Sequence, residues 1–266
     1  MSTIVTDSAR ERPPIDHFGG RFGLAGALAA EWTKLWTTRT AYVCLPVAAL
    51  LMAVFTFYYG SLARINDEPV QPVGSAPVSA AVLVQFAFVV LAMTTVTSEY
   101  TTGSIRASLL WVPVRGRLQW AKALVAGAVS FCGGVVLGVL GTTVSWMTFR
   151  GHATFEPAEA IGQVLSLGAY LAAVAVLTVG VSFAVRSAAG VLALVSLLLA
   201  GLPMVLLGLG GKTLLTINDY LPQSAGAHFM KGEGDTYAPV VGLAIVVTWS
   251  AAAHLTGLIA LRRRDA

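Results

Sequence analysis

Few side chains in the long apolar stretches of this chain could move a proton or attack a carbon atom. Gln85 and His254 stand out among the hydroxyl and tryptophan side chains there. A membrane proton relay needs ionisable groups that face one another, and these stretches hold no Asp or Glu. We therefore expect His254 to be a hydrogen-bonded interface residue rather than a catalytic base, and we expect no enzyme and no ion-driven carrier, although hydroxyl and carbonyl oxygens alone are able to bind sodium.

Two other features that could indicate chemistry are dismissed on their sequence context. The segment 208–213 ends in the Gly-Lys-Thr of a phosphate-binding loop, but the pattern requires glycine five residues before Gly211, where Leu206 stands. Cys44 and Cys132 both fall in apolar stretches and are interpreted as packing thiols. We therefore predict no catalytic residue, metal or cofactor in this chain.

The elements that hold these residues are apolar runs long enough to cross a bilayer. The 266 residues are 56% hydrophobic and 11% charged, and a helix needs about 20 apolar residues to span the hydrocarbon core. Backbone amides within that core must bond internally, which favours helices. The sequence thus predicts an all-α polytopic membrane protein with six transmembrane helices, near residues 42–59, 78–97, 123–146, 161–185, 190–209 and 239–261.

The distribution of basic residues predicts the orientation. If the N-terminus is inside, 13 of the 17 Lys and Arg residues lie on the inner side, as the positive-inside rule requires. Both termini and the connection 98–122 are then cytoplasmic, and the membrane is the bacterial plasma membrane. The basic excess follows from this rule and from attraction to anionic lipids, so no nucleic-acid partner is needed.

The N-terminal region divides into a polar cytoplasmic tail, 1–21, and a segment, 22–39, that opens a single six-helix transmembrane domain over 22–264. One stripe of this segment is apolar, at Leu24, Leu28, Trp32, Leu35 and Trp36. Glu31, Lys34 and Thr38 lie off the stripe. The pattern predicts an interfacial amphipathic elbow helix, and the alternative is that it merely extends the first span. The interfacial residues that we single out are Glu31, Trp32, Lys34, Trp36 and Arg39.

The connection 98–122 is too long and too basic for an inert anchor, which would need only a short polar turn. Ile105, Leu109 and Val112 form an apolar stripe, and Pro113 ends this short helix. Residues 114–117 are predicted to turn the chain, and 118–122 to lead into the third span. Glu99 is close in sequence to Arg106, so a local ion pair is the simple alternative to a coupling role for Glu99.

Three further features concern the opposite side and the fifth span. The connection 60–77 is predicted to be irregular and solvated. The connection 210–238 is too apolar for a free loop, so it should lie at the outer interface or dip into the membrane. Pro203 is predicted to kink the fifth span.

At three places the chain resembles the permease subunits of type-2 ATP-binding-cassette (ABC) transporters, especially the actinobacterial ones. The first is the segment 31–39, Glu-Trp-Thr-Lys-Leu-Trp-Thr-Thr-Arg, and the second is 99–106, followed by Pro113, Arg115 and Lys122. The third is Tyr-Leu-Pro at 220–222 before the last span. The resemblance covers about residues 22–264.

The resemblance implies a non-catalytic subunit driven by a separate ATPase that binds ATP and magnesium. Two permeases, identical or homologous, would pair to form the path, and most members of the family export their substrates. The coupling helix would lie in 98–122, with coupling residues Glu99, Gly103, Ile105, Arg106, Leu109, Pro113 and Arg115. Two alternatives stay open, a self-powered secondary carrier or channel and a substrate-capture membrane subunit.

Overall fold

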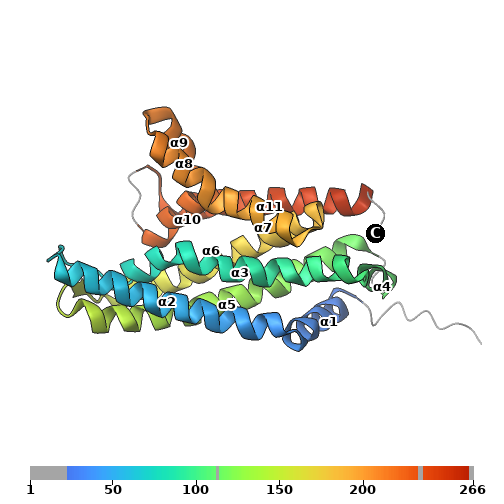
Figure 1. Cartoon of the computed structure of the whole chain (residues 1–266), viewed down its shortest axis with the longest axis horizontal. Coiled ribbons are helices and arrows are strands. Elements are labelled where there is room, and N and C mark those ends of the chain that lie inside the picture. Colours follow the sequence, from blue (N-terminus) through green and yellow to red (C-terminus); the bar gives the residue numbers. More distant parts are fainter. Residues whose placement is uncertain (1–22, 112–113, 233–235, 264–266) are drawn as a thin grey trace, which may run out of the picture.

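The computed structural model describes residues 23–111, 114–232 and 236–263, and these are folded into a bundle of helices (Figure 1). The predicted tail, 1–21, and Pro113 lie outside the described residues. The helices are α1 (Leu24–Thr37), α2 (Arg39–Ile65), α3 (Ser75–Thr102), α4 (Ile105–Trp111), α5 (Arg115–Phe149), α6 (Pro157–Val185), α7 (Ala188–Ser196), the π-helical η1 (Leu197–Gly201), α8 (Leu202–Leu209), α9 (Lys212–Asp219), α10 (Pro222–Lys231) and α11 (Pro239–Arg263).

Six helical segments of the described chain are long and apolar enough to cross a membrane, which confirms the predicted all-α polytopic class. They are α2, α3, α5, α6, the continuous segment Ala188–Leu209 and α11. α3 and α6 are the most deeply buried of them, and the other helices pack around this pair. The site discussed below lies where α1, α3, α4 and α5 meet.

The third spanning helix begins earlier than predicted. Val114 is extended, and α5 starts at Arg115 and runs for 35 residues. At about 1.5 Å per residue this length exceeds a hydrocarbon core of about 30 Å. The predicted turn over 114–117 is therefore wrong beyond Val114. The side chains of Leu118, Ala121 and Lys122 are buried against the bundle, which keeps this end helical.

The segment before the first span is a helix of its own. α1 ends at Thr37, Thr38 is extended with φ −90° and ψ 145°, and α2 begins at Arg39. α1 therefore does not simply continue α2, and Figure 1 shows it set at an angle to α2.

Close helix contacts depend on glycine at the bundle centre. A Cβ atom at Gly180 of α6 would lie 2.5 Å from the carbonyl carbon of Ala253 in α11. The backbones of α6 and α11 approach one another there because no side chain separates them.

The fifth span is irregular just before its proline. The π-helical turn of η1 precedes Pro203, which has no N–H to donate to the preceding turn. The predicted distortion is therefore present as a π-helical segment, and α8 and α9 lead away from α11 in Figure 1.

The two connections at the far end of the bundle are more ordered than the sequence indicates. The irregular loop predicted over 60–77 is partly wrong, since α2 continues to Ile65 and β1 (Gln71–Pro72) pairs in parallel with β2 (Ala153–Thr154). In the connection 210–238, α10 packs against α3, α6 and α11. Gln85 Nε2 of α3 donates to Gln223 Oε1 of α10 over 2.6 Å, so α10 is part of the bundle.

Candidate functional site

The inward face of α1 carries a carboxylate. Its buried residues are Ala27, Glu31 and Leu35, at four-residue spacing, and Glu31 is only 5% exposed. Trp32 is 48% exposed, as a side chain that faces the membrane surface would be. The interpretation of Glu31 as part of a polar outer face is wrong, because the charge of Glu31 is matched by a partner inside the protein.

That partner is Lys122 of α5, which is fully buried. Its ammonium group donates to Glu31 Oε2 over 2.7 Å, to Glu99 Oε1 over 2.8 Å and to the carbonyl of Thr95 over 2.8 Å. An ammonium group has three donors, so all three are used. Lys122 thus joins α1, α3 and α5 at one point.

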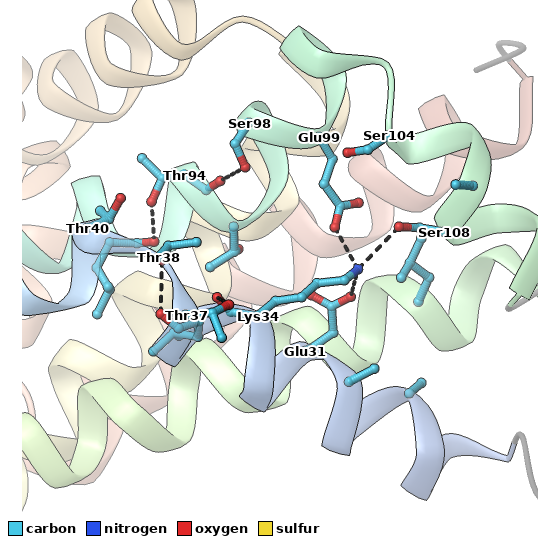
Figure 2. A pocket seen from close by; sticks show the side chains of 17 residues that line it. Glu31, Lys34, Thr37, Thr38, Thr40, Thr94, Ser98, Glu99, Ser104 and Ser108 are labelled. Carbon is cyan, nitrogen blue, oxygen red and sulfur yellow. Dashed lines mark hydrogen bonds and ion pairs between the residues drawn. The ribbon is translucent and has the colours of Figure 1, made fainter.

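Lys34 completes the arrangement from the exposed side. Its ammonium group donates to Glu31 Oε1 and Glu99 Oε1, each over 2.9 Å, and to Ser108 Oγ of α4 over 3.2 Å (Figure 2). Glu31, Lys34, Glu99 and Lys122 are called the charge cluster below. Sequence proximity suggested Arg106 as a partner of Glu99, whereas these two lysines lie 65 and 23 residues away from it along the chain.

The charges of the cluster balance, and this balance explains how Glu31, Glu99 and Lys122 are held away from water. Burying an ion is costly unless it is paired and hydrogen-bonded. Partial burial lowers the pKa of the Lys34 ammonium, but hydrogen bonds and attraction from Glu31 and Glu99 outweigh that effect and hold the pKa above its ordinary value of 10.5. Lys34 therefore stays charged at neutral pH.

A cavity of about 590 Å³ opens beside the charge cluster, between α1, α3 and α4. Several of its hydroxyl groups donate to carbonyl groups of their own helices, including those of Thr38, Thr94 and Thr95. The apolar side chains of Leu35, Leu91 and Leu118 also line it. Beside this cavity, α4 contacts the bundle through the face that carries Ile105 and Leu109.

α4 is a short helix with one buried and one exposed face. Ile105 is 3% exposed and packs in the bundle, with Leu109 partly buried against the same cluster. Leu110 is 84% exposed, and Arg106 is also exposed. Leu110 therefore points away from the bundle, on a different face of α4 from Ile105.

Gly103 sets the direction in which α4 leaves α3. Its φ of 72° is left-handed, a conformation that glycine adopts without strain. Its N–H donates to the carbonyl of Tyr100 over 3.3 Å and closes the end of α3. The predicted coupling residue Gly103 therefore lies at the hinge between the second span and α4.

Arg115, at the start of α5, contacts the end of the last span. Its Nη1 donates to the carbonyl of Leu261 over 2.6 Å. Arg186 of the α6–α7 turn reaches the carbonyl of Ala260 over 3.5 Å and lies over the ring of Tyr100. Cations at a helix C-terminus stabilise its free carbonyl groups, so both arginines tie the end of α11 to the side of the bundle that holds α4.

The remaining elbow residues form an aromatic border. Trp36 packs edge-on against Trp32 at 5.8 Å and against Tyr42 of α2 at 6.1 Å, measured between ring centroids. Arg39 is exposed at the first position of α2. Tryptophan and arginine side chains in this setting are typical of a membrane–water interface.

Sequence reasoning missed Leu110 and Ser108 as site residues and gave Lys122 no role. A lysine inside an apolar helix is itself a signal for a buried partner. Leu110 is off the apolar stripe 105, 109 and 112, so its position on the opposite face of the helix could have been found.

The six apolar helices and the buried, balanced charges define a multi-pass membrane protein. Residues 27–203 match the family described as ABC-2 family transporter protein. The chain belongs to this family and is the membrane-spanning permease component of an ABC transporter. The match begins in α1 and ends in α8, so it contains the whole charge cluster and α4. A comparison with the curated proteins finds no match.

Proposed function

We propose that this chain is the permease of an exporter in the bacterial plasma membrane and that α4 is the helix through which a separate ATPase drives it. The ATPase subunit would bind ATP and magnesium, and two permeases, identical or homologous, would pair to form the path. The observation that carries the proposal is that α4 exposes Leu110 on one face and buries Ile105 on another. The face of α4 that carries Leu110 is exposed, while the face that carries Ile105 is packed against the spans.

The charge cluster gives α4 a stiff connection to the membrane helices. The ammonium group of Lys34 donates hydrogen bonds both to Ser108 of α4 and to Glu99 of α3. Lys122 then extends the connection to α5. A push on α4 would therefore move α1, α3 and α5 together instead of being lost in a flexible linker.

The contact surface on α4 differs from the apolar stripe in the sequence. Ile105 and Leu109 face the bundle and anchor the helix, so the ATPase would meet Arg106, Ala107 and Leu110. Gly103 and Arg115 would act by setting the direction of α4 and the packing of α11. Glu99 would act as a positioning residue through both lysines of the charge cluster.

The orientation proposed for the chain follows from its charges. With both termini in the cytoplasm, α4 and the charge cluster face the compartment that holds ATP. α1 would then lie at the inner membrane surface, where the exposed Trp32 meets lipid headgroups.

Purification of the tagged full-length chain from its native membranes tests the proposal. We expect an ATP-binding subunit to co-purify, and Leu110→Gln to reduce its yield relative to the wild type. Leu215→Gln, which changes another exposed leucine at the far end of the bundle, is the matched control and should leave the yield unchanged. An unchanged yield with Leu110→Gln, or ion-gradient transport by the chain purified without any ATPase, would overturn the proposal.

A further inference from the structure

A second charged feature lies at the opposite end of the bundle from the charge cluster. A groove of about 430 Å³ runs between the last turns of α2 and α5. Its apolar wall includes Phe57, Val144 and Met147, and its rim carries Arg64 of α2 and Arg150, which directly follows α5. This surface is called the arginine groove below.

Among the residues that the structure describes, the two arginines have no acidic partner. In the residues that the structure describes, no hydrogen bond or salt bridge involves the side chain of Arg64 or Arg150. The predicted orientation places only four of the 17 basic residues on this side, and two of these four line one groove. Two guanidinium groups on the rim of one groove give it a positive charge that favours an anion.

The depth of the arginines matches the phosphate layer of a bilayer. Arg64 is five residues past Tyr59, the predicted end of the first span, and Arg150 is four past Trp146, the predicted end of the third. At 1.5 Å per residue these offsets are about 6–8 Å. The headgroup region on each side of the hydrocarbon core is about 5–8 Å thick.

Arg150 also occupies a backbone position at which a side chain is unfavourable. It ends α5 with φ 43°, in the left-handed region that helix-terminating glycine prefers. Gly151 follows it directly. An arginine at this position carries a backbone cost that glycine would avoid.

We propose that the arginine groove binds an anionic phospholipid, with its phosphate between Arg64 and Arg150 and an acyl chain along Phe57, Val144 and Met147. Guanidinium groups bind phosphate oxygens in pairs through charge-assisted hydrogen bonds. An acyl chain suits the apolar wall, where Phe57 and Met147 are 60% and 66% exposed. This inference does not depend on the function proposed above.

Native mass spectrometry of the full-length chain tests the proposal, with phosphatidylglycerol and phosphatidylcholine as probes. We expect one phosphatidylglycerol to bind more tightly than phosphatidylcholine, and Arg64→Gln and Arg150→Gln each to weaken its binding about tenfold, as the loss of a hydrogen bond to a charged group would. Arg150→Lys keeps the charge and should retain more of the binding than Arg150→Gln.

Lys212→Gln and Lys231→Gln are the matched controls, since both change exposed basic residues that lie outside the arginine groove. They should leave binding unchanged, and circular dichroism should show that all the variants are folded. Equal binding of the two lipids, or unchanged binding of phosphatidylglycerol to the folded Arg64→Gln/Arg150→Gln variant, would overturn the proposal. Displacement of the lipid by low-millimolar inorganic phosphate would also overturn it, in favour of a free anion.

Discussion

Lys122 and Glu31 form a buried ion pair across 91 residues of sequence, with Nζ and Oε2 2.7 Å apart. Lys122 belongs to the third spanning helix and Glu31 to the helix before the first. The pair fixes α1 against the bundle at the level of α4. An apolar contact could supply similar stability, but it would not impose one register, because only one placement of α1 leaves both charges paired.

Removing one partner of this pair should be more harmful than removing both. Lys122→Met leaves two carboxylates with only Lys34, and we expect it to lower the free energy of unfolding by about 3–5 kcal/mol. Glu31→Gln/Lys122→Met keeps the remaining charges balanced and should be less destabilised than Lys122→Met. Thermal unfolding in detergent micelles measures both.

The exposed Lys212→Met serves as the control for loss of a lysine and should have no measurable effect. If the double variant is less stable than Lys122→Met by the full cost of Glu31→Gln, the two residues act independently, and the pairing would not matter to the fold.

Lys34 should contribute less, and its contribution should depend on alkaline pH. Its side chain is 46% exposed, so solvent screening limits its effect to below about 1 kcal/mol. Folding favours its protonated form, so the contribution is complete below the ordinary pKa of 10.5 and is lost as pH rises through the raised pKa. The difference in unfolding temperature between wild type and Lys34→Met should therefore be constant from pH 7 to pH 9 and shrink above pH 10.5. A difference that grew with pH would contradict this linkage.

Gly103 should be sensitive to substitution through its backbone and not through crowding. Its φ is 72°, and no atom lies within 4 Å of the position that a Cβ would occupy. Gly103→Val should therefore redirect α4, whereas Gly103→Asn should be tolerated better, since asparagine adopts left-handed conformations more readily. Thiol labelling of Leu110→Cys in each background reports the exposure of α4. Equal labelling in the Gly103→Val and Gly103→Asn backgrounds would contradict the hinge role of Gly103.

The contact between α6 and α11 should not accept a methyl group. Gly180→Ala would place Cβ 2.5 Å from backbone atoms of Ala253, so we expect it to destabilise the protein by about 1–3 kcal/mol. Gly162→Ala changes a glycine of the same helix with no atom within 4 Å. It should be neutral or stabilising by about 0.5–1 kcal/mol, because alanine is the better helix former. Equal unfolding temperatures for the two variants would contradict the close packing at Gly180.

The six spans could be predicted because each depends only on a local property, the length of an uncharged apolar run. The inward position of Glu31 could not, because the periodicity of α1 treats any carboxylate as solvated. Its burial depends on Lys122, 91 residues further along the chain, and one sequence does not reveal such a distant pair.

Only part of the candidate site could be predicted, again because one sequence shows local patterns and not distant contacts. The existence of the short helix α4 follows from its local apolar stripe, so that part of the prediction needs no distant partner. Helical periodicity separates Ile105 from Leu110, but which of the two faces packs against the bundle is known only from the structure. Arg115, placed in a predicted turn, instead begins α5, because burial of Leu118 and Lys122 extends the helix.

The most direct test of the account is the contact made by α4 itself. A photo-crosslinking amino acid at position 110, illuminated in native membranes, should join this chain to an ATP-binding subunit, while the same residue at position 215 should not. Crosslinks to that subunit from position 215 and none from position 110 would show that the ATPase binds elsewhere and that α4 is not its contact site.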